Sequence, residues 1–558
     1  MEPAAVLLLL LLVALLGWGL RGRGGPDGLP PGPLPLPLLG NLLQLDPTRL
    51  YQSLIKVRRE GVGEGGPQAW LCLTVAATVS VERLLCARRC TKRWGASKQM
   101  GGGGGLPVLI LIFQRRELRP RESELSSRYG PVFTVYLGTR PCVVLNGYEA
   151  VRDALVLQGD RFSGRGDLPV FHRFTRGNGI AFSNGEKWRV LRSFALTSLK
   201  NFGVGRRSIE ARIQEEARYL GRELAKTDGA PFDPLNLICN AVSNVICAVV
   251  FGQRYGYDDG DFLTLLGLFN DNFRLMSSRC GELYNIFPDL MRLLPGPHQR
   301  IFSNFEKLRV FISERIRWHQ ETRRPGQPRD FIDCFLDQMD KEKQDPLTHF
   351  HRETLVMTTH NLFFGGTETT STTLRSSLLL LLKYPDVAER VYAEIDEVMG
   401  RTGAPRLDHR DRMPYTHAVL HEAQRFVSVL PTGLPRALTR HTRFRGYFLP
   451  KGTNVIPLLV SVHRDPTQFK DPETFNPGNF LDEKGAFRNS DAFMPFAPGK
   501  RICLGAGLAR MEIFLFFTSI LQRFRLCPLV PPEAIDVTPQ YTGLGNVPPP
   551  YKLRMVAR

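Results

Sequence analysis

Apolar residues recur at helical spacing through most of the chain after residue 125. Leucine runs such as residues 378–382 lie within these segments, and the three-to-four-residue repeat predicts buried helices. One stretch differs, since residues 128–147 (RYGPVFTVYLGTRPCVVLNG) hold two short apolar runs around Gly138. This pattern predicts two strands joined by a turn, with a helix from about Tyr148. The chain is therefore expected to be mainly α with small β-sheets.

The amino-terminal region predicts a membrane anchor and a linker. Residues 4–20 are apolar and are followed by Arg21 and Arg23, which predicts an anchor over residues 1–20 whose far side faces the cytosol. Glu2 gives the wrong polarity for a cleaved signal peptide. Residues 21–41 form a basic, proline-rich linker, which is expected to be stiff. We expect it to pack on the protein's own surface through Leu34, Leu36, Leu38 and Leu39.

Residues 57–124 follow neither helical nor strand periodicity and include five consecutive glycines. We interpret this segment as an insertion that interrupts a catalytic domain over residues 42–558. Its irregular, glycine-rich composition suggests the hypothesis that it is translated non-coding sequence. Recovery of its peptides from the native protein would contradict this hypothesis.

The net charge limits the possible classes of binding partner, and the cysteine content indicates the redox compartment. A net charge of +19 suits nucleic acid, an anionic membrane or an acidic protein, but no nucleic-acid-binding motif is visible, so we expect no nucleic acid partner. Ten scattered cysteines indicate a reducing compartment rather than a disulfide framework. Cys86 and Cys90 lack the further ligands of a zinc site.

Residues 361–370 (NLFFGGTETT) place polar residues inside a predicted apolar helix. One interpretation is a kinked structural helix whose hydroxyls bond to the preceding turn. The alternative is a groove at Gly365 and Gly366 for a small ligand, with Glu368 and Thr369 handling protons or water.

Residues 414–426 predict another helix, on which Glu422 and Arg425 share one face. Apolar neighbours suggest that this pair is buried, so that each charge needs the other and further partners.

The stretch FAPGKRICLG, residues 496–505, carries the strongest chemical signal. A lone cysteine is usually a small buried hydrophobe. Here Cys503 precedes a predicted helix start and follows Arg501, which would favour a thiolate. Gly499 and Gly505 let a flat cofactor approach, and Phe496 can shield the sulfur. These features fit a heme held by one thiolate.

The same stretch resembles the heme-thiolate signature of the cytochromes P450, F-x-x-G-x-R-x-C-x-G, at every fixed position. GGTETT resembles the oxygen-binding helix of that family, and HEAQR carries its E-x-x-R pair. The likeness is greatest to microsomal family 2. Two departures are Gly365, where the family commonly has alanine, and Asn479, where many members have arginine.

The resemblance implies roles for individual residues. Cys503 would be the axial ligand of heme b, with a loop shaped by Phe496, Gly499 and Gly505, and Glu368 and Thr369 would be catalytic. The expected heme propionate contacts are Trp188, Arg192, Arg501, Arg165 and Arg436. The expected substrate pocket includes Leu168, Phe182, Gly365, Leu434 and Leu544.

The implied function is a monooxygenase that inserts one atom of O₂ into a small apolar xenobiotic, fatty acid or steroid. Because no dinucleotide fingerprint is present, electrons would come from NADPH through NADPH–cytochrome P450 reductase, with cytochrome b5 as a second expected partner. The protein would lie at the endoplasmic reticulum membrane, its body in the cytosol. The alternatives are a peroxide-rearranging enzyme, which would lack the Glu368 and Thr369 pair, a non-catalytic heme or sterol binder, and a variant inactivated by its insertion.

Overall fold

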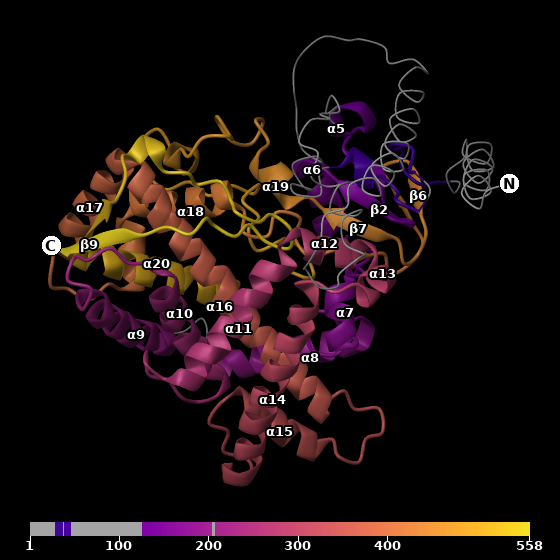
Figure 1. Cartoon of the computed structure of the whole chain (residues 1–558), viewed down its shortest axis with the longest axis horizontal. Helices are drawn as coiled ribbons and strands as arrows, with labels where there is room; N and C mark the ends of the chain where they lie inside the picture. Colours follow the sequence, from indigo (N-terminus) through magenta and orange to yellow (C-terminus); the bar gives the residue numbers. More distant parts are fainter. Residues whose placement is uncertain (1–27, 37, 46–124, 204–206) are drawn as a thin grey trace, which may run out of the picture. The chain divides into compact units, whose positions relative to one another are not determined.

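The computed structural model describes residues 28–36, 38–45, 125–203 and 207–558 (Figure 1). The chain divides into two compact units, one of residues 1–55 and 125–558 and the other of residues 56–124. The insertion predicted for residues 57–124 and the anchor predicted for residues 1–20 lie outside the described residues. Within the described ranges, no helix is both long and apolar enough to cross a membrane.

Helices make up most of the described chain, which confirms the mainly α class. In chain order they are α5 (Leu125–Tyr129), α6 (Tyr148–Arg152), α7 (Pro169–Thr175), α8 (Gly185–Asn201), α9 (Arg207–Ala225), α10 (Leu235–Val250), α11 (Gly260–Met276), α12 (Arg279–Ile286), α13 (Pro288–Leu293), α14 (His298–Thr322), α15 (Phe331–Lys341), α16 (Arg352–Lys383), α17 (Pro385–Met399), α18 (Pro414–Val427), α19 (Leu459–His463) and α20 (Ala506–Arg523). Shorter helical turns are η1 (Leu42–Gln44), η2 (Asp153–Leu157), η3 (Leu407–Arg412), η4 (Pro477–Phe480) and η5 (Pro532–Ala534).

The strands form small sheets. The largest has the order β1 (Val132–Leu137), β2 (Arg140–Leu145), β7 (Asn454–Pro457), β4 (Arg436–Ala437) and β3 (Gly164–Arg165). The two-stranded sheets pair β5 (Thr442–Phe444) with β6 (Tyr447–Leu449) and β8 (Phe524–Pro528) with β9 (Leu553–Ala557). The predicted hairpin is confirmed, because β1 and β2 are antiparallel across Gly138 at φ +64°. The helix expected at Tyr148 is α6.

Helix α16 lies at the centre of the larger unit. It packs against α10, α11, α14, α18 and α20 (Figure 1), and residues 378–382 are all buried. A helix that is covered on every side needs no single apolar stripe. This placement carries the polar segment of residues 361–370 into the core.

The proline-rich linker docks on β1 through its backbone. The N–H of Thr134 donates to the carbonyl of Pro31 at 2.9 Å, and Asn41 Oδ1 accepts from the N–H of Tyr136 at 2.7 Å. The expectation that the linker packs through its leucines is wrong for Leu34, Leu38 and Leu39, which are 58%, 77% and 38% exposed. Proline lacks an N–H, but its carbonyl still accepts, so the docking uses the main-chain oxygen of Pro31 together with the side-chain oxygen of Asn41.

Candidate functional site

A tight turn holds the Cys503 loop in front of α20. Gly499 has φ +82°, and a Cβ on it would lie 1.8 Å from the carbonyl oxygen of Leu155, so only glycine fits here. The N–H of Cys503 donates to the carbonyl of Phe496 at 3.0 Å. The Cys503 side chain is left exposed, three residues before α20 begins.

Opposing effects act on the Cys503 thiol. Desolvation by the surrounding protein raises its pKa, and this effect outweighs the N–H groups of Gly505 and Ala506 and the charge of Arg192, which lower it. The two N–H groups lie at the amino-terminal end of α20, where the helix dipole favours an anion. A metal ion bound to the sulfur would shift the balance fully to the thiolate.

Buried arginines gather beside this loop. Arg165 and Arg436 are register partners on β3 and β4, and they and Arg501 are 8%, 3% and 6% exposed. Arg192, on α8, donates from Nη2 to the carbonyl of Ile502 at 2.6 Å. Like charges that face each other on neighbouring strands destabilise a sheet, so this arrangement favours a bound anion.

The pKa values of these arginines show that the charge is uncompensated. Burial and then the neighbouring arginines lower the pKa of Arg165, and they lower those of Arg436 to about 10 and Arg501 to about 9. Nε of Arg436 and Nη1 of Arg501 are buried without a hydrogen-bond partner in the described chain. Buried cations with unused donors fit a ligand that carries two carboxylates, as the propionates of heme do.

Asn184, which directly precedes α8, and Trp188, within α8, complete this arginine cluster. The guanidinium carbon of Arg501 lies 3.9 Å from the ring centroid of Trp188. Asn184 Oδ1 accepts from the N–H of Arg165 at 2.6 Å and from Nη2 of Arg501 at 3.2 Å. Sequence reasoning missed Asn184, although it lies in the SNGEKWRVLR stretch, because an asparagine before a helix usually caps that helix.

The two glycines of α16 have different surroundings. A Cβ on Gly366 would lie 3.1 Å from Cγ1 of Ile246, so Gly366 permits the close approach of α10. A Cβ on Gly365 would meet nothing within 4 Å, and Gly365 is exposed. Of the two, Gly365 therefore leaves space beside the helix.

Glu368 and Thr369 follow these glycines with different polar contacts. Burial raises the pKa of Glu368 to about 8, against the charge of Arg375, and its Oε1 is buried without a partner in the described chain. The Thr369 hydroxyl donates to the carbonyl of Gly365 at 2.8 Å. The bond from the Thr369 hydroxyl to the preceding turn is the one expected of a structural helix. The neighbouring Glu368 is different, because a carboxylic acid with an unpartnered oxygen in the described chain can exchange protons.

The five expected pocket residues differ in exposure. Gly365 is exposed, whereas Leu168, Leu434 and Leu544 are partly buried against the main core. Phe182 is 2% exposed and its ring stacks on Phe171 at 4.3 Å. A pocket role for these residues stays a prediction, and for Phe182 the contact seen is core packing.

The predicted ion pair is fully buried. Glu422 and Arg425 are both 0% exposed, and two hydrogen bonds of 2.7 Å join them. The three remaining N–H donors of Arg425 reach the carbonyls of His463, Pro472 and Thr474. Asn479 Nδ2 lies 3.5 Å from Glu422 Oε1, so the residue that replaces the family's arginine still touches the pair.

His463 extends this network to the cysteine loop, and sequence reasoning missed it. Burial lowers the pKa of its ring to about 3. As a neutral imidazole, it accepts at Nε2 from the N–H of Met494 at 3.0 Å, while Nδ1 lies 2.7 Å from the Ser428 hydroxyl. No local pattern signals this role, since His463 lies 31 residues before Met494.

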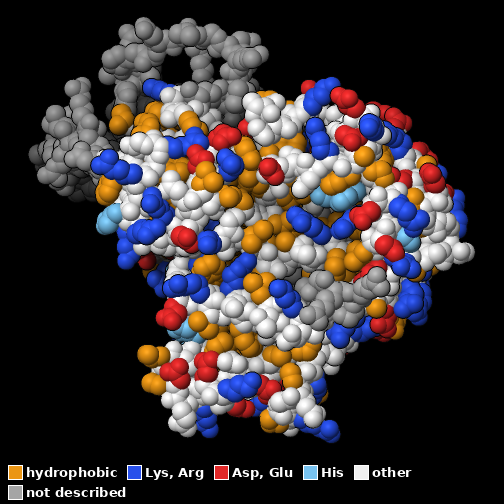
Figure 2. Space-filling model, turned by 180° about the vertical axis from the view of Figure 1, so that it is seen from behind, with side chains coloured by type: hydrophobic (Ala, Val, Ile, Leu, Met, Phe, Trp, Pro, Cys, Tyr) orange, Lys and Arg blue, Asp and Glu red, His pale blue; other side chains and the backbone are white. Residues whose placement is uncertain are grey.

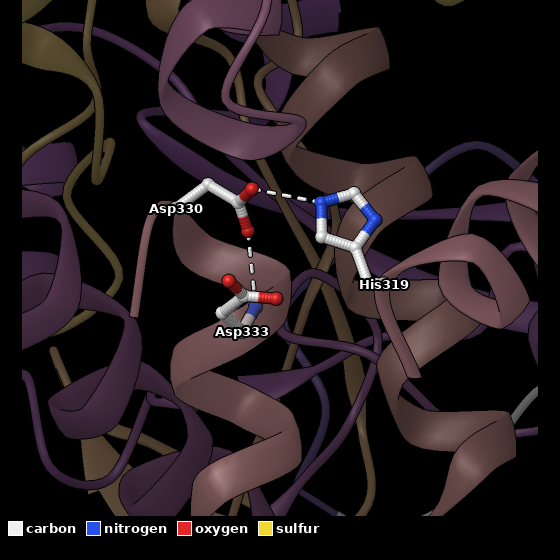
Figure 3. A group of neighbouring side chains, drawn as sticks. All are labelled: His319, Asp330 and Asp333. Atoms are coloured by element: carbon white, nitrogen blue, oxygen red, sulfur yellow. Dashed lines mark hydrogen bonds and ion pairs between the residues drawn. The ribbon is translucent and has the colours of Figure 1, made fainter. Parts of the chain in front are cut away.

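A second group of titratable residues lies at the end of α14 and the start of α15. Figure 3 shows His319 pointing at Asp330, with Asp333 beside it. Nε2 of His319 lies 2.7 Å from Asp330 Oδ2 and Nδ1 lies 2.7 Å from the carbonyl of Arg315. Burial alone would lower the pKa of His319, but Asp330 outweighs it and the pKa is raised. Both nitrogens face hydrogen-bond acceptors, and the ring links α14 to the start of α15.

An exposed cysteine at a helix start, beside cations that require carboxylates, is typical of a heme-thiolate protein. Comparison with known proteins agrees. The family model described as Cytochrome P450 matches residues 100–555. Cytochrome P450 2F2 of Mus musculus is 56% identical over 455 residues, which cover 81% of this chain and 93% of that protein.

Further relatives extend the match. Cytochrome P450 2F3 of Capra hircus is 52% identical over 87% of this chain and 99% of its own length. Cytochrome P450 2B4 of Oryctolagus cuniculus is 45% identical over 100% of both chains. The chain therefore belongs to the cytochrome P450 family, as a family 2 monooxygenase with a heme-thiolate cofactor, and the predicted family, enzyme class and cofactor are confirmed.

Proposed function

We propose that Cys503 is the thiolate ligand of the heme iron and that the neighbouring buried cations bind its propionates. The observation that carries this proposal is the uncompensated group of Arg165, Arg436 and Arg501 beside the exposed cysteine. Arg192 and Trp188 lie at the same cluster through Ile502 and Arg501. Phe496, Gly499 and Gly505 shape the loop that brings the sulfur to the iron.

When bound, the heme supplies the redox chemistry that activates O₂. The protein's own part is to hold the thiolate, orient the cofactor and deliver protons. With a pKa of about 8, Glu368 is a neutral acid near pH 7 and can give up a proton. We propose that Glu368 and the Thr369 hydroxyl together order the water that supplies protons to the reaction.

The substrate in this proposal is a small apolar organic molecule of the xenobiotic, fatty acid or steroid classes. Support comes from the apolar character of Leu168, Leu434 and Leu544 and from the open side of α16 at Gly365. An apolar pocket holds such a molecule and excludes bulk water. Phe182 would support this pocket from the core.

Electron supply and location follow from the family. Family 2 monooxygenases draw electrons from a separate reductase, and we propose NADPH–cytochrome P450 reductase as the partner, with cytochrome b5 as a second donor. We propose further that residues 1–20 anchor the protein in the endoplasmic reticulum membrane, with the linker of residues 21–41 joining the anchor to a cytosolic catalytic domain.

Replacement of the cysteine tests the central assignment. In Cys503→Ala, the carbonyl complex of the reduced protein should lose its characteristic thiolate absorption band, because no sulfur remains to bind the iron. Cys527→Ala is the matched control, since Cys527 is another free cysteine of the described chain, and it should keep the band. A band that survives in Cys503→Ala would place the ligand elsewhere.

A further inference from the structure

A cavity of about 240 Å³ lies between η3, α18 and α20. One of its lining residues, Arg510, also packs over the ring of Phe496 in the Cys503 loop, 5.1 Å from the ring centroid. The polar lining of the cavity consists of Arg410, His417, His421, Gln424, Asn489 and Arg510. The remaining lining residues are apolar, and none of the lining residues is acidic. The cavity therefore combines cationic and amide donors with an apolar wall.

The two arginines of this cavity reach its surface, since Arg510 is exposed and the Arg410 side chain is 35% exposed. Within the described chain, neither side chain makes a hydrogen bond to a carboxylate. Nε of Arg410 is buried and makes no hydrogen bond within the described chain. The carboxylate oxygen of Asp411 lies 3.8 Å from it, beyond hydrogen-bond distance, on a side chain that is 81% exposed. Burial and then the charge of Arg410 lower the pKa of Arg510, against the opposing effect of Cys503.

Two histidines of α18, His417 and His421, also lie close to these positive charges. Burial, followed by Arg410 and Arg510, lowers the pKa of His417 to about 4. Burial, His417 and both arginines lower that of His421 to about 3. The His417 ring stacks on Phe487 at 3.7 Å and makes no hydrogen bond in the described chain, so one of its nitrogens can donate an N–H to a ligand.

We propose that this cavity binds a tetrahedral oxyanion of the sulfate or phosphate class, held by Arg410 and Arg510 and by the amides of Gln424 and Asn489. Guanidinium groups match the oxygens of such anions geometrically and electrostatically. An anion would remove the repulsion between the two arginines. The volume leaves room for a small apolar group esterified to the anion, which would lie against Leu420, Phe487 and Phe514.

Calorimetric titration of the full-length holoenzyme with sodium sulfate tests the proposal. Sodium sulfate takes the place of part of the sodium chloride, so that the ionic strength stays constant. Saturable binding at one site is expected. Arg410→Gln should weaken it at least about tenfold, since one charge-assisted contact is lost. Arg412→Gln is the matched control, because Arg412 belongs to the same η3 but is exposed and outside the lining. The carbonyl band of each variant verifies that it has folded.

A second variant tests the charge argument independently. Gln424→Glu places a carboxylate in the cavity and should abolish sulfate binding while raising the midpoint of thermal unfolding. Titration with phenyl phosphate separates the two sources of the anion: tighter binding than that of inorganic phosphate indicates an ester, and equal binding indicates a free anion. Absence of saturable sulfate binding in the wild type, or equal affinity in Arg410→Gln, would overturn the proposal.

Discussion

At the scale of single residues, two buried acids illustrate how partners decide chemistry. Glu422 accepts two hydrogen bonds from Arg425, so each of these buried groups has a partner. Glu368 has an unpartnered oxygen, and burial raises its pKa to about 8. Both acids lie in helices with apolar flanks, so the sequence alone does not show which of them has a partner.

The raised pKa of Glu368 predicts a pH-dependent stability. The folded protein keeps a proton that the unfolded chain releases above about pH 4.3, so the group should lower stability progressively as pH rises from there to about 8. Glu368→Gln should remove this dependence and gain a few kcal/mol, about the size of the linkage, near pH 7. Thermal unfolding midpoints across this pH range check it, and identical slopes in both proteins would contradict it.

The hydroxyl beside this acid predicts an effect on coupling. Thr369→Ala removes a group that can order water, so the variant should bind heme but form severalfold less product per NADPH and release more peroxide. Thr369→Ser keeps the hydroxyl and serves as the control. Reconstitution with the reductase and parallel assays of NADPH, peroxide and product give the measurement; unchanged coupling in Thr369→Ala would remove Thr369 from the proton path.

At the scale of elements, α16 combines a structural and a functional side. Back-bonds from Thr369, Thr373 and Ser377 to residues four positions earlier satisfy three hydroxyls inside the helix. Gly366 lets α10 pack closely, whereas Gly365 faces open space. The helix continues unbroken over 32 residues, so tertiary packing outweighs the low helix propensity of its glycines and threonines.

The two glycines of α16 predict opposite effects of alanine. Gly365→Ala meets no neighbour, so it should stabilise the helix by about 1 kcal/mol and fill space beside the proposed pocket. Gly366→Ala would press on Ile246 and should cost about 1–3 kcal/mol through overpacking. Chemical denaturation of the two variants gives the comparison, and equal shifts would mean that α10 moves aside freely.

At the scale of the whole molecule, charge is spread rather than concentrated on the face seen in Figure 2, where Lys and Arg side chains alternate with acidic and apolar ones. Buried cations concentrate around the Cys503 loop, where Arg165, Arg436 and Arg501 lie, and two arginines that are more exposed line the cavity between α18 and α20. The net charge of +19 therefore says less about partners than the positions of these few arginines.

Removal of residues 57–124 should preserve the enzyme. The hydrogen bonds and strand pairings described for the heme site and the sheets join residues 125–558 to one another, and the shortened chain keeps all of them. The entropy cost of closing a connection grows slowly with its length, so the chain with the shorter connection should fold at least as well. Equal or greater holoenzyme yield and NADPH-dependent turnover are expected, and a shortened chain that binds no heme would assign the segment a structural role.

The sequence by itself determined the features that depend on neighbours in the chain. The Cys503 loop, the hairpin around Gly138 and the Glu422–Arg425 pair each lie within about twenty residues, where turn chemistry and helical spacing fix the geometry. The mainly helical class follows from the same local periodicity. Residues 165, 192, 436 and 501 were placed near the heme by resemblance alone, since no local rule connects them.

Only the tertiary structure decided which distant groups meet and whether their charges are satisfied. It places Arg165 opposite Arg436, leaves their charge without a carboxylate, and joins Arg425 to Met494 through His463. Within the described residues it also leaves Oε1 of Glu368 without a hydrogen-bond partner and places Arg410 and Arg510 on one cavity. Protonation and anion affinity depend on burial and on through-space charge, and these quantities arise only when remote segments pack together.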